Sequence, residues 1–235
     1  GLIFCPNFYC KSKMHSLKYF IIGLVLVVLS PLAHSQEAIP VFAYHRFGDD
    51  RYPSTNIDMK VFKKQLEYLQ ENNYTVLSLG EALDRLDKGN LPEKPAVLTV
   101  DDGYSSFYEN AFPLLQEYGY PATIFINTSH VGGKSYMNWE QLKKLDKAGI
   151  EIGNHSHDHP HFVNAENPDE FFIQDVSKAQ ELFKRHLGFK PELFSYPYGE
   201  YTRELAEKAE SMGFKAAAAQ RSGVLGASTN RFAIP

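Results

Sequence analysis

The chain is poor in cysteine. It has two cysteines in 235 residues, Cys5 and Cys10, and both precede the first methionine, Met14. We expect the protein to start at Met14 and residues 1–13 to be upstream sequence. A chain that starts there contains no thiol, which excludes disulfides, thiolate zinc sites and a lipid-anchoring cysteine. Its stability must then come from a hydrophobic core or from a metal bound by other ligands.

The sequence also lacks a block of basic residues and a strong excess of either charge. Lys and Arg together number 24, Asp and Glu number 28, and the formal net charge is −4. This balance argues against nucleic acid as the main partner. With 43% hydrophobic residues, the chain is long enough to form one sizeable core, so we expect one main domain. Nothing in the sequence specifies an oligomeric state.

No hydrophobic run has the length of a membrane span. Lys18 is followed by the apolar segment 19–29 and then by a small-residue site at 33–35. The segment falls short of the ~18–20 residues that a spanning helix needs, and the pattern is typical of a secretory signal peptide. We therefore predict cleavage after Ser35, a main domain at 36–235, and an exported protein that is periplasmic, envelope-associated or extracellular. Left uncleaved, the segment would anchor the chain to a membrane.

Apolar strands and amphipathic helices alternate along the rest of the chain, and no repeat or low-complexity segment interrupts them. This alternation predicts a parallel α/β fold, and short strands joined by single helices favour a barrel. We expect strands at 39–44, 75–77, 96–100, 121–127, within 149–154, 193–195 and 215–219, and helices at 59–72, 79–88, 104–118, 139–148, 169–187 and 203–211.

Two acidic residues, Asp101 and Asp102, directly follow the strand predicted at 96–100. Gly103 permits a sharp turn after them. Adjacent carboxylates repel each other unless a cation lies between them or one is protonated, so the pair indicates metal binding, acid–base catalysis or both. The alternative is a turn in which an Asp caps the next helix. Functional sites of such folds gather at the carboxyl ends of strands, where these acids lie.

Four of the nine histidines lie in the stretch GNHSHDHPH, residues 153–161. His155 with His159, and His157 with His161, both have a spacing that presents two imidazoles to one ion, and spacing alone does not choose between the pairs. Imidazoles with a carboxylate and no thiolate suit zinc or another divalent metal, and they leave positions open for water and substrate. The alternative is a polar surface loop.

The segments LTVDDG, HSHDHP and SYPYG resemble the first three motifs of the NodB-homology polysaccharide deacetylases, carbohydrate esterase family 4. The similarity runs from about Pro40 to the end of the chain, and the three motifs in this order are highly specific. The resemblance implies an irregular (β/α) barrel that carries a divalent metal, with zinc as the first candidate. It also implies a hydrolase that removes acetyl groups from N-acetylglucosamine units of an acetylated polysaccharide and releases acetate.

The resemblance further implies a role for each matching residue. Asp101 corresponds to the general base and Asp102 to a metal ligand. His155 and His159 complete the metal site, because the second motif of the family reads His-Ser/Thr-X-X-His-Pro. The other two histidines of the stretch then become loop residues.

Two features depart from the usual pattern of this family. Ser195 stands where the third motif usually has an arginine that orients the base, although Tyr198 can still offer its backbone N–H to a developing oxyanion. No histidine follows His186, whereas most of the family takes its catalytic acid from a C-terminal Leu-X-X-His motif. The poly-N-acetylglucosamine deacetylase branch, which the SYPYG variant resembles, has this histidine after its N-terminal strand. His45 occupies that place and is the expected catalytic acid.

Aromatic residues near the motifs are candidates to stack on sugar rings. We expect Tyr196 and Trp139 to bind substrate in this way, although most aromatic residues of a barrel belong to its core. Arg221 and Asn230 lie near a later strand end, from which they could contact the site, and neither is assigned a role. Two alternative functions are hydrolysis of another amide or ester, since a fold does not fix a substrate, and glycan or metal binding by a protein whose catalysis has lapsed. The missing motif arginine favours the second of these.

Overall fold

The computed structural model describes residues 38–219, 221 and 223–235. The two cysteines, the predicted signal peptide and its cleavage site lie outside these residues, so those expectations stay predictions. Among the described helices, none combines the length and the apolar composition that crossing a bilayer requires.

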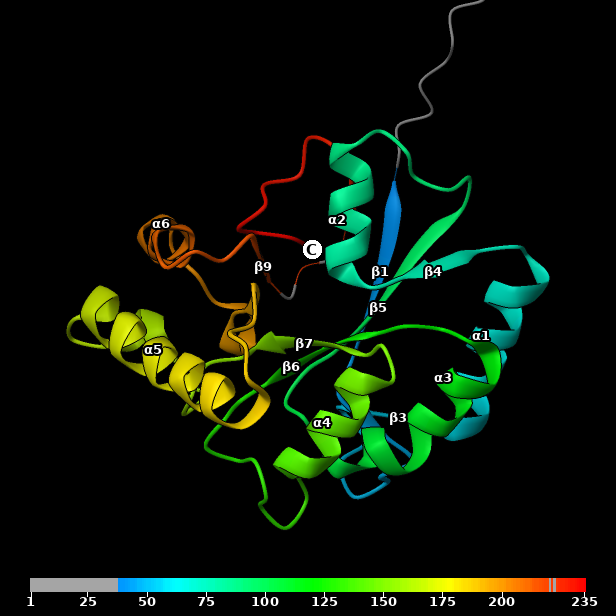
Figure 1. Ribbon diagram of the computed structural model, residues 1–235, viewed down its shortest axis with the longest axis horizontal. Helices are drawn as coiled ribbons and strands as arrows, with labels where there is room; N and C mark the ends of the chain where they lie inside the picture. Colours follow the sequence, from blue (N-terminus) through cyan, green and yellow to red (C-terminus); the bar gives the residue numbers. More distant parts are fainter. Residues whose placement is uncertain (1–37, 220, 222) are drawn as a thin grey trace, which may run out of the picture. The chain divides into compact units, whose positions relative to one another are not determined.

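One eight-stranded sheet organises the described residues (Figure 1). The order is β10-β1-β5-β6-β7-β8-β9, and β4 pairs with the first half of β5. All pairs are parallel except that of β10 with β1. No ladder joins β9 to β10 in the described part of the chain, so the predicted α/β barrel is confirmed in an irregular form. The strands are β1 (Ile39–Tyr44), β4 (Thr75–Leu77), β5 (Pro95–Val100), β6 (Thr123–Ile126), β7 (Glu151–Asn154), β8 (Leu193–Ser195), β9 (Ala216–Ala218) and β10 (Val224–Leu225).

The helices begin at capping residues that the sequence supplies. Asp58, Ser78, Asn138 and Thr202 each accept a backbone N–H at the start of α1, α2, α4 and α6. The helix predicted from residue 104 begins later, because a π-helical turn, Phe107–Ala111, precedes α3. The helices are α1 (Met59–Glu71), α2 (Leu79–Asp87), α3 (Phe112–Tyr118), α4 (Trp139–Lys147), α5 (Pro168–Leu187) and α6 (Arg203–Ser211).

One small element was not predicted. Strands β2 (Arg46–Phe47) and β3 (Asn56–Ile57) form a separate parallel pair that closes the loop after β1. Each strand has two residues, which is too few to produce a periodic signal in the sequence.

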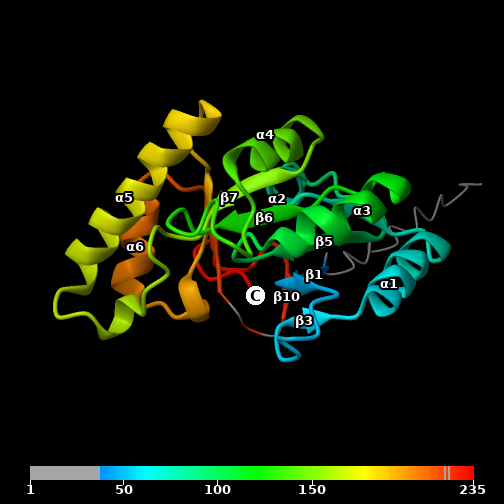
Figure 2. The ribbon, with the colours of Figure 1, turned by 90° about the horizontal axis from the view of Figure 1, so that it is seen from below.

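Alternate residues of the strands pack on different helices. Leu98 and Val100 of β5 face the cluster formed with α1, α3 and α4, whereas Val97 packs in the cluster that contains α2. Figures 1 and 2 show α5 and α6 lying side by side, and both pack on β8 and β9. The parallel sheet is therefore covered on both faces, as its apolar strands require.

Helix α2 fills the inner face of the sheet near the amino ends of the strands. Its apolar side chains pack with Ile39, Leu193 and Ala216, which are the first residues of β1, β8 and β9. The start of the helix is fixed by Thr123, which is buried, and by Glu151, which is partly buried. Leu79 N–H donates to Thr123 Oγ1 at 2.8 Å, and the Thr123 hydroxyl donates to Glu151 Oε2 at 2.7 Å. This arrangement leaves the inner face free at the carboxyl ends, where the polar residues of the motifs lie.

Candidate active site

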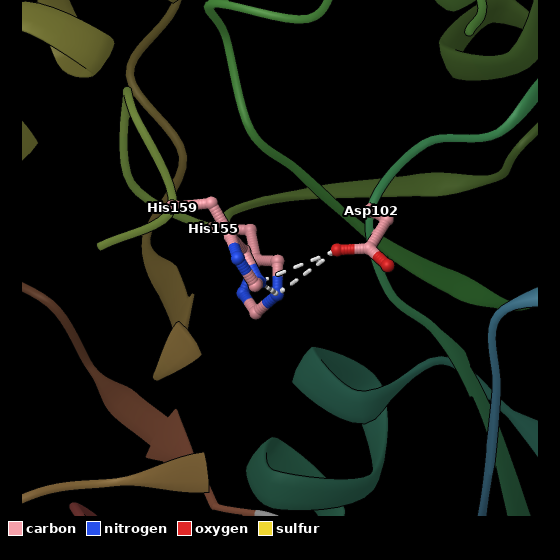
Figure 3. Close-up of side chains that lie close together, drawn as sticks. All are labelled: Asp102, His155 and His159. Atoms are coloured by element: carbon pink, nitrogen blue, oxygen red, sulfur yellow. Dashed lines mark hydrogen bonds and ion pairs between the residues drawn. The ribbon is translucent and has the colours of Figure 1, made fainter. Parts of the chain in front are cut away.

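Three side chains from two distant segments converge at the carboxyl ends of β5 and β7. Asp102 follows β5, and His155 follows β7 with His159 one turn of loop further on. Asp102 Oδ1 lies 3.6 Å from His155 Nε2 and 3.4 Å from His159 Nε2, and the two Nε2 atoms are 3.2 Å apart. Figure 3 shows both imidazoles turned toward the Asp102 carboxylate. The three residues form a group that can hold a metal ion.

The spacing of these three atoms fits one tetrahedral ion. Ligands at about 2.0–2.1 Å from a zinc ion lie about 3.3–3.4 Å from one another in tetrahedral geometry. The observed separations of 3.2, 3.4 and 3.6 Å surround that value. A single ion would therefore contact all three atoms without a rearrangement of the loop, and a fourth position would stay open for water or substrate.

The histidines are held in the form that binds a metal. His155 Nδ1 lies 2.8 Å from the carbonyl oxygen of Ser195, which can only accept, so Nδ1 carries the hydrogen and the Nε2 lone pair faces the site. Burial lowers the pKa of His155, and burial together with the neighbouring His155 lowers the pKa of His159. Both imidazoles are therefore neutral at pH 7, as metal binding requires.

The backbone of the site is strained. A left-handed backbone conformation at a residue other than glycine destabilises the folded state by about 1–3 kcal/mol. Such a conformation is kept only where the surrounding structure imposes it. Four of the five such residues in the described chain belong to the motifs, namely Asp102, Ser156, His159 and Tyr198, with Asn73 as the fifth. Hydrogen bonds hold the loop in place, because Ser156 N–H donates to Asn154 Oδ1 at 2.7 Å and His159 N–H donates to Ser156 Oγ at 3.0 Å.

Asp101 and His45 lie on one cavity beside this cluster. Tyr44 of β1 is opposite Val100 of β5, so the next residues of the two parallel strands, His45 and Asp101, lie at neighbouring strand ends. Asp101 N–H donates to the carbonyl oxygen of Tyr44 at 2.9 Å, which fixes this register. Both residues line a cavity of about 460 Å³ on the inner face, whose other walls include Ser195 and Arg221.

Tyr198 connects the third motif to the metal-binding loop. It lies in the turn after β8 with φ of +59°, and the residue is 46% exposed. The ring stacks on His161, with centroids 3.7 Å apart and an interplanar angle of 7°, and lies edge-on to His159 at 4.5 Å. The turn that carries the Tyr198 backbone N–H therefore lies beside the cluster of Asp102, His155 and His159. His161 contacts this turn and does not belong to the cluster.

The prediction that Tyr196 stacks on substrate is wrong, because Tyr196 is fully buried. The Tyr196 side chain has no exposed surface, packs among Phe194 and Tyr201, and donates its hydroxyl to the carbonyl oxygen of Phe232 at 3.2 Å. A ring without an exposed face offers no platform to a sugar, so Tyr196 is a core residue.

The other predicted stacking residue, Trp139, is partly buried at the start of α4. It lies parallel to His186 at 4.4 Å and edge-on to Phe183 at 5.8 Å. It is not among the residues that line the cavity of Asp101 and His45. Substrate binding by Trp139 stays a prediction.

The structure brings to the site two residues to which the sequence interpretation gave no role. Arg221 lines the cavity of Asp101 and His45, although it was unassigned. Asn127, which is 1% exposed, directs Nδ2 toward Asp102 Oδ1 at 3.5 Å and holds His130 through Oδ1. The signal for Asn127 was available, because it is a polar residue directly after the buried strand β6.

Comparison with known proteins identifies the family. The family model described as Polysaccharide deacetylase matches residues 88–217, which is more than half of the chain and includes all three motifs. The chain belongs to the polysaccharide deacetylase family. The predicted resemblance is thus confirmed, and the Asp102, His155 and His159 cluster is a feature of a polysaccharide deacetylase domain.

Individual members resemble this polysaccharide deacetylase domain to different extents. It is 31% identical to the putative polysaccharide deacetylase YxkH of Bacillus subtilis over 178 residues, which are 75% of this chain and 62% of the relative. It is 26% identical to the poly-beta-1,6-N-acetyl-D-glucosamine N-deacetylase of Staphylococcus aureus, over 83% of this chain and 71% of that protein. The structure of IcaB from Ammonifex degensii superimposes with a TM-score of 0.77 at 30% identity, covering 84% of this chain and 90% of that one.

Proposed function

We propose that this protein is an exported, metal-dependent hydrolase that removes N-acetyl groups from a polysaccharide containing N-acetylglucosamine. The observation that carries the proposal is the convergence of two sets of groups. Asp101 and His45 line one cavity, and the Asp102, His155 and His159 cluster lies at the same ends of the strands. An acid–base pair beside a divalent-metal site can catalyse the hydrolysis of an unactivated amide.

Asp102, His155 and His159 would hold the divalent cation, and zinc is the candidate we favour because imidazole and carboxylate ligands at this spacing suit a tetrahedral ion. When bound in such a site, a divalent cation polarises a carbonyl group and makes water more acidic. Asp101 accepts the proton of the water that adds to the carbonyl carbon of the acetamide. The main-chain hydrogen bond to Tyr44 keeps Asp101 at the strand end, where it lines the cavity.

The second half of the reaction needs a donor for the leaving nitrogen. The C–N bond of the acetamide breaks, acetate forms, and the amine takes a proton from His45, which lies next to Asp101 across the β1 and β5 register. Negative charge that develops on the carbonyl oxygen is stabilised by the backbone N–H of Tyr198. This assignment does not need an arginine at position 195, where the chain has Ser195.

Similarity supports the choice of substrate. Poly-beta-1,6-N-acetyl-D-glucosamine is named as the substrate of the S. aureus relative, and IcaB aligns with 84% of this chain. The signal-like segment at 19–29 supports export, which brings the enzyme to envelope or extracellular polysaccharide.

An acetate-release assay on metal-reconstituted protein tests the proposed function. We expect poly-beta-1,6-N-acetylglucosamine to release acetate, and chelation followed by added zinc to abolish and restore the release. Chitin oligomers, peptidoglycan and acetylated xylan measured in parallel establish the preferred glycan. Saturable glycan binding without acetate from any of these substrates would reject the hydrolase in favour of a binding protein.

Replacing His45 with alanine should lower kcat by roughly 10²-fold, because the leaving amine loses its proton donor. Metal content should not change, since His45 is not one of the three residues of the metal cluster. The control is Lys178→Ala, at an exposed position of α5 that does not line the cavity. A His45→Ala enzyme with the turnover of the control would exclude His45 as the proton donor.

A further inference from the structure

We infer that Asp175 is a positioning residue, which sets the separation of His155 and His159 before a metal binds. The inference rests on the metal site of the proposed function. Asp175 belongs to α5, outside the three sequence motifs, and is 4% exposed. Its carboxylate contacts the loop between the two histidine ligands.

Both oxygens of Asp175 accept hydrogen bonds from that loop. His157 N–H donates to Oδ1 at 2.6 Å, and Asp158 N–H donates to Oδ2 at 2.9 Å. The two amides are consecutive and lie midway between the ligands. A carboxylate that accepts both of them fixes the position and the orientation of this peptide unit.

The loop needs such a contact because its backbone is strained. Ser156 and His159, on either side of the two amides, both have left-handed φ values, +70° and +53°. Residues other than glycine adopt this region where the surroundings impose it. A relaxed loop would change the direction of the His159 side chain relative to His155, and the 3.2 Å approach of the two Nε2 atoms would be lost.

A second buried contact supports the same peptide. The His157 imidazole, 8% exposed, makes a 2.8 Å hydrogen bond through Nδ1 with Thr128 Oγ1. His157 is therefore directed away from the ligand cluster and toward the loop after β6. The metal-binding loop is held from β6 on one side and from α5 on the other.

The position of α5 itself does not depend on Asp175. The helix packs in the core through Phe172, Val176, Ala179 and Phe183, none of which is more than 1% exposed. A polar residue in this apolar stripe costs free energy of burial, and burial raises the pKa of Asp175. The two loop amides offset this cost, because they donate hydrogen bonds to the buried carboxylate.

The test compares Asp175→Asn with Asp169→Asn, the same substitution in the first turn of the same helix, where the carboxylate is partly exposed and pairs with Lys208 at 3.5 Å. An asparagine side chain in place of Asp175 can accept one of the two N–H groups and directs its own N–H at the other. We expect the affinity for Co²⁺, measured by competition with a chromophoric chelator, to fall by about 10–100-fold. We also expect the visible Co²⁺ spectrum to change. Asp169→Asn should match the wild type in both measurements.

Thermal unfolding of the metal-free proteins separates positioning from general stability. The inference predicts that Asp175→Asn loses most of the stabilisation that Co²⁺ gives the wild type, whatever its metal-free melting temperature. An unchanged Co²⁺ affinity and spectrum would overturn the role of Asp175. Asp175→Ala, which leaves room for water at the two amides, is the second variant. If neither variant folds without metal, Asp175 is a folding residue and the inference is overturned.

The same measurements distinguish this inference from the proposed function. A wild-type protein that binds no Co²⁺ overturns the metal site itself, and with it the role of Asp175. A wild type that binds Co²⁺ together with an Asp175→Asn variant that binds it equally well overturns only the role of Asp175.

Discussion

Replacing Asp101 with asparagine should lower the rate of acetate release by about 10³-fold, within the range that a general base contributes. The amide of asparagine has nearly the shape of the carboxylate but cannot accept the proton of the attacking water. Asp101 is 6% exposed at the end of β5, where its backbone N–H bonds Tyr44, and an isosteric change leaves that hydrogen bond in place. The loss should therefore appear in kcat, whereas metal content and thermal stability should stay near the wild-type values.

The control for this variant is Asp146→Asn on the exposed side of α4, which should release acetate at the wild-type rate. Metal content is measured on the same samples. If Asp101→Asn keeps more than about a tenth of the activity, which is outside the range for loss of a general base, another group accepts the proton. If the variant loses its metal as well, Asp101 belongs to the metal site and its assignment as the base is wrong.

Local sequence signals predicted most of the elements that position this site. The run at 96–100 ended at two acids, and the structure has β5 at Pro95–Val100 with the acids directly after it. Strand 39–44 and helix 203–211 were predicted at their observed bounds. These segments combine clear periodicity with strong capping or breaking residues, so neighbours in sequence suffice to define them.

The choice between the two histidine pairs could not be made from spacing. His155 with His159 and His157 with His161 are equally spaced, and the difference is in their partners from elsewhere in the chain. His155 meets Asp102 and the carbonyl of Ser195, whereas His157 meets Thr128. The motif resemblance favoured the first pair, and the structure supplies the physical reason.

The direction of a side chain at the end of a short strand also could not be predicted from the sequence. Tyr196 follows the three-residue strand β8, and its ring faces the core beneath α5 and α6. Three residues are too few to establish which face of a sheet the next side chain occupies.

The role of Asp175, by contrast, had a signal in the sequence, because this acid interrupts the apolar stripe of α5 formed by Phe172, Val176 and Ala179. A buried acid at such a position requires hydrogen-bond donors from outside its helix.

Replacing Asp102 with alanine should abolish acetate release and remove most of the stabilisation by metal. The carboxylate is the negatively charged member of the cluster, and its Oδ1 lies 3.4–3.6 Å from both Nε2 atoms. Without it, two neutral imidazoles would have to hold a divalent cation alone. At a metal concentration 100 times its dissociation constant, the wild type should gain about 2.7 kcal/mol in free energy of unfolding. A variant that binds 100-fold more weakly should gain about 0.4 kcal/mol at the same concentration.

Urea unfolding of the wild type and Asp102→Ala, with and without zinc, measures how much zinc raises the free energy of unfolding of each protein. The metal-free Asp102→Ala protein should be less stable than the metal-free wild type, because residue 102 has φ of +73° and alanine tolerates this left-handed conformation less well than aspartate. The effect of zinc is therefore read from the stabilisation that zinc gives each protein over its own metal-free form. An Asp102→Ala variant that zinc stabilises as strongly as the wild type would show that the ion binds elsewhere. The convergence of Asp102, His155 and His159 would then have no part in the reaction.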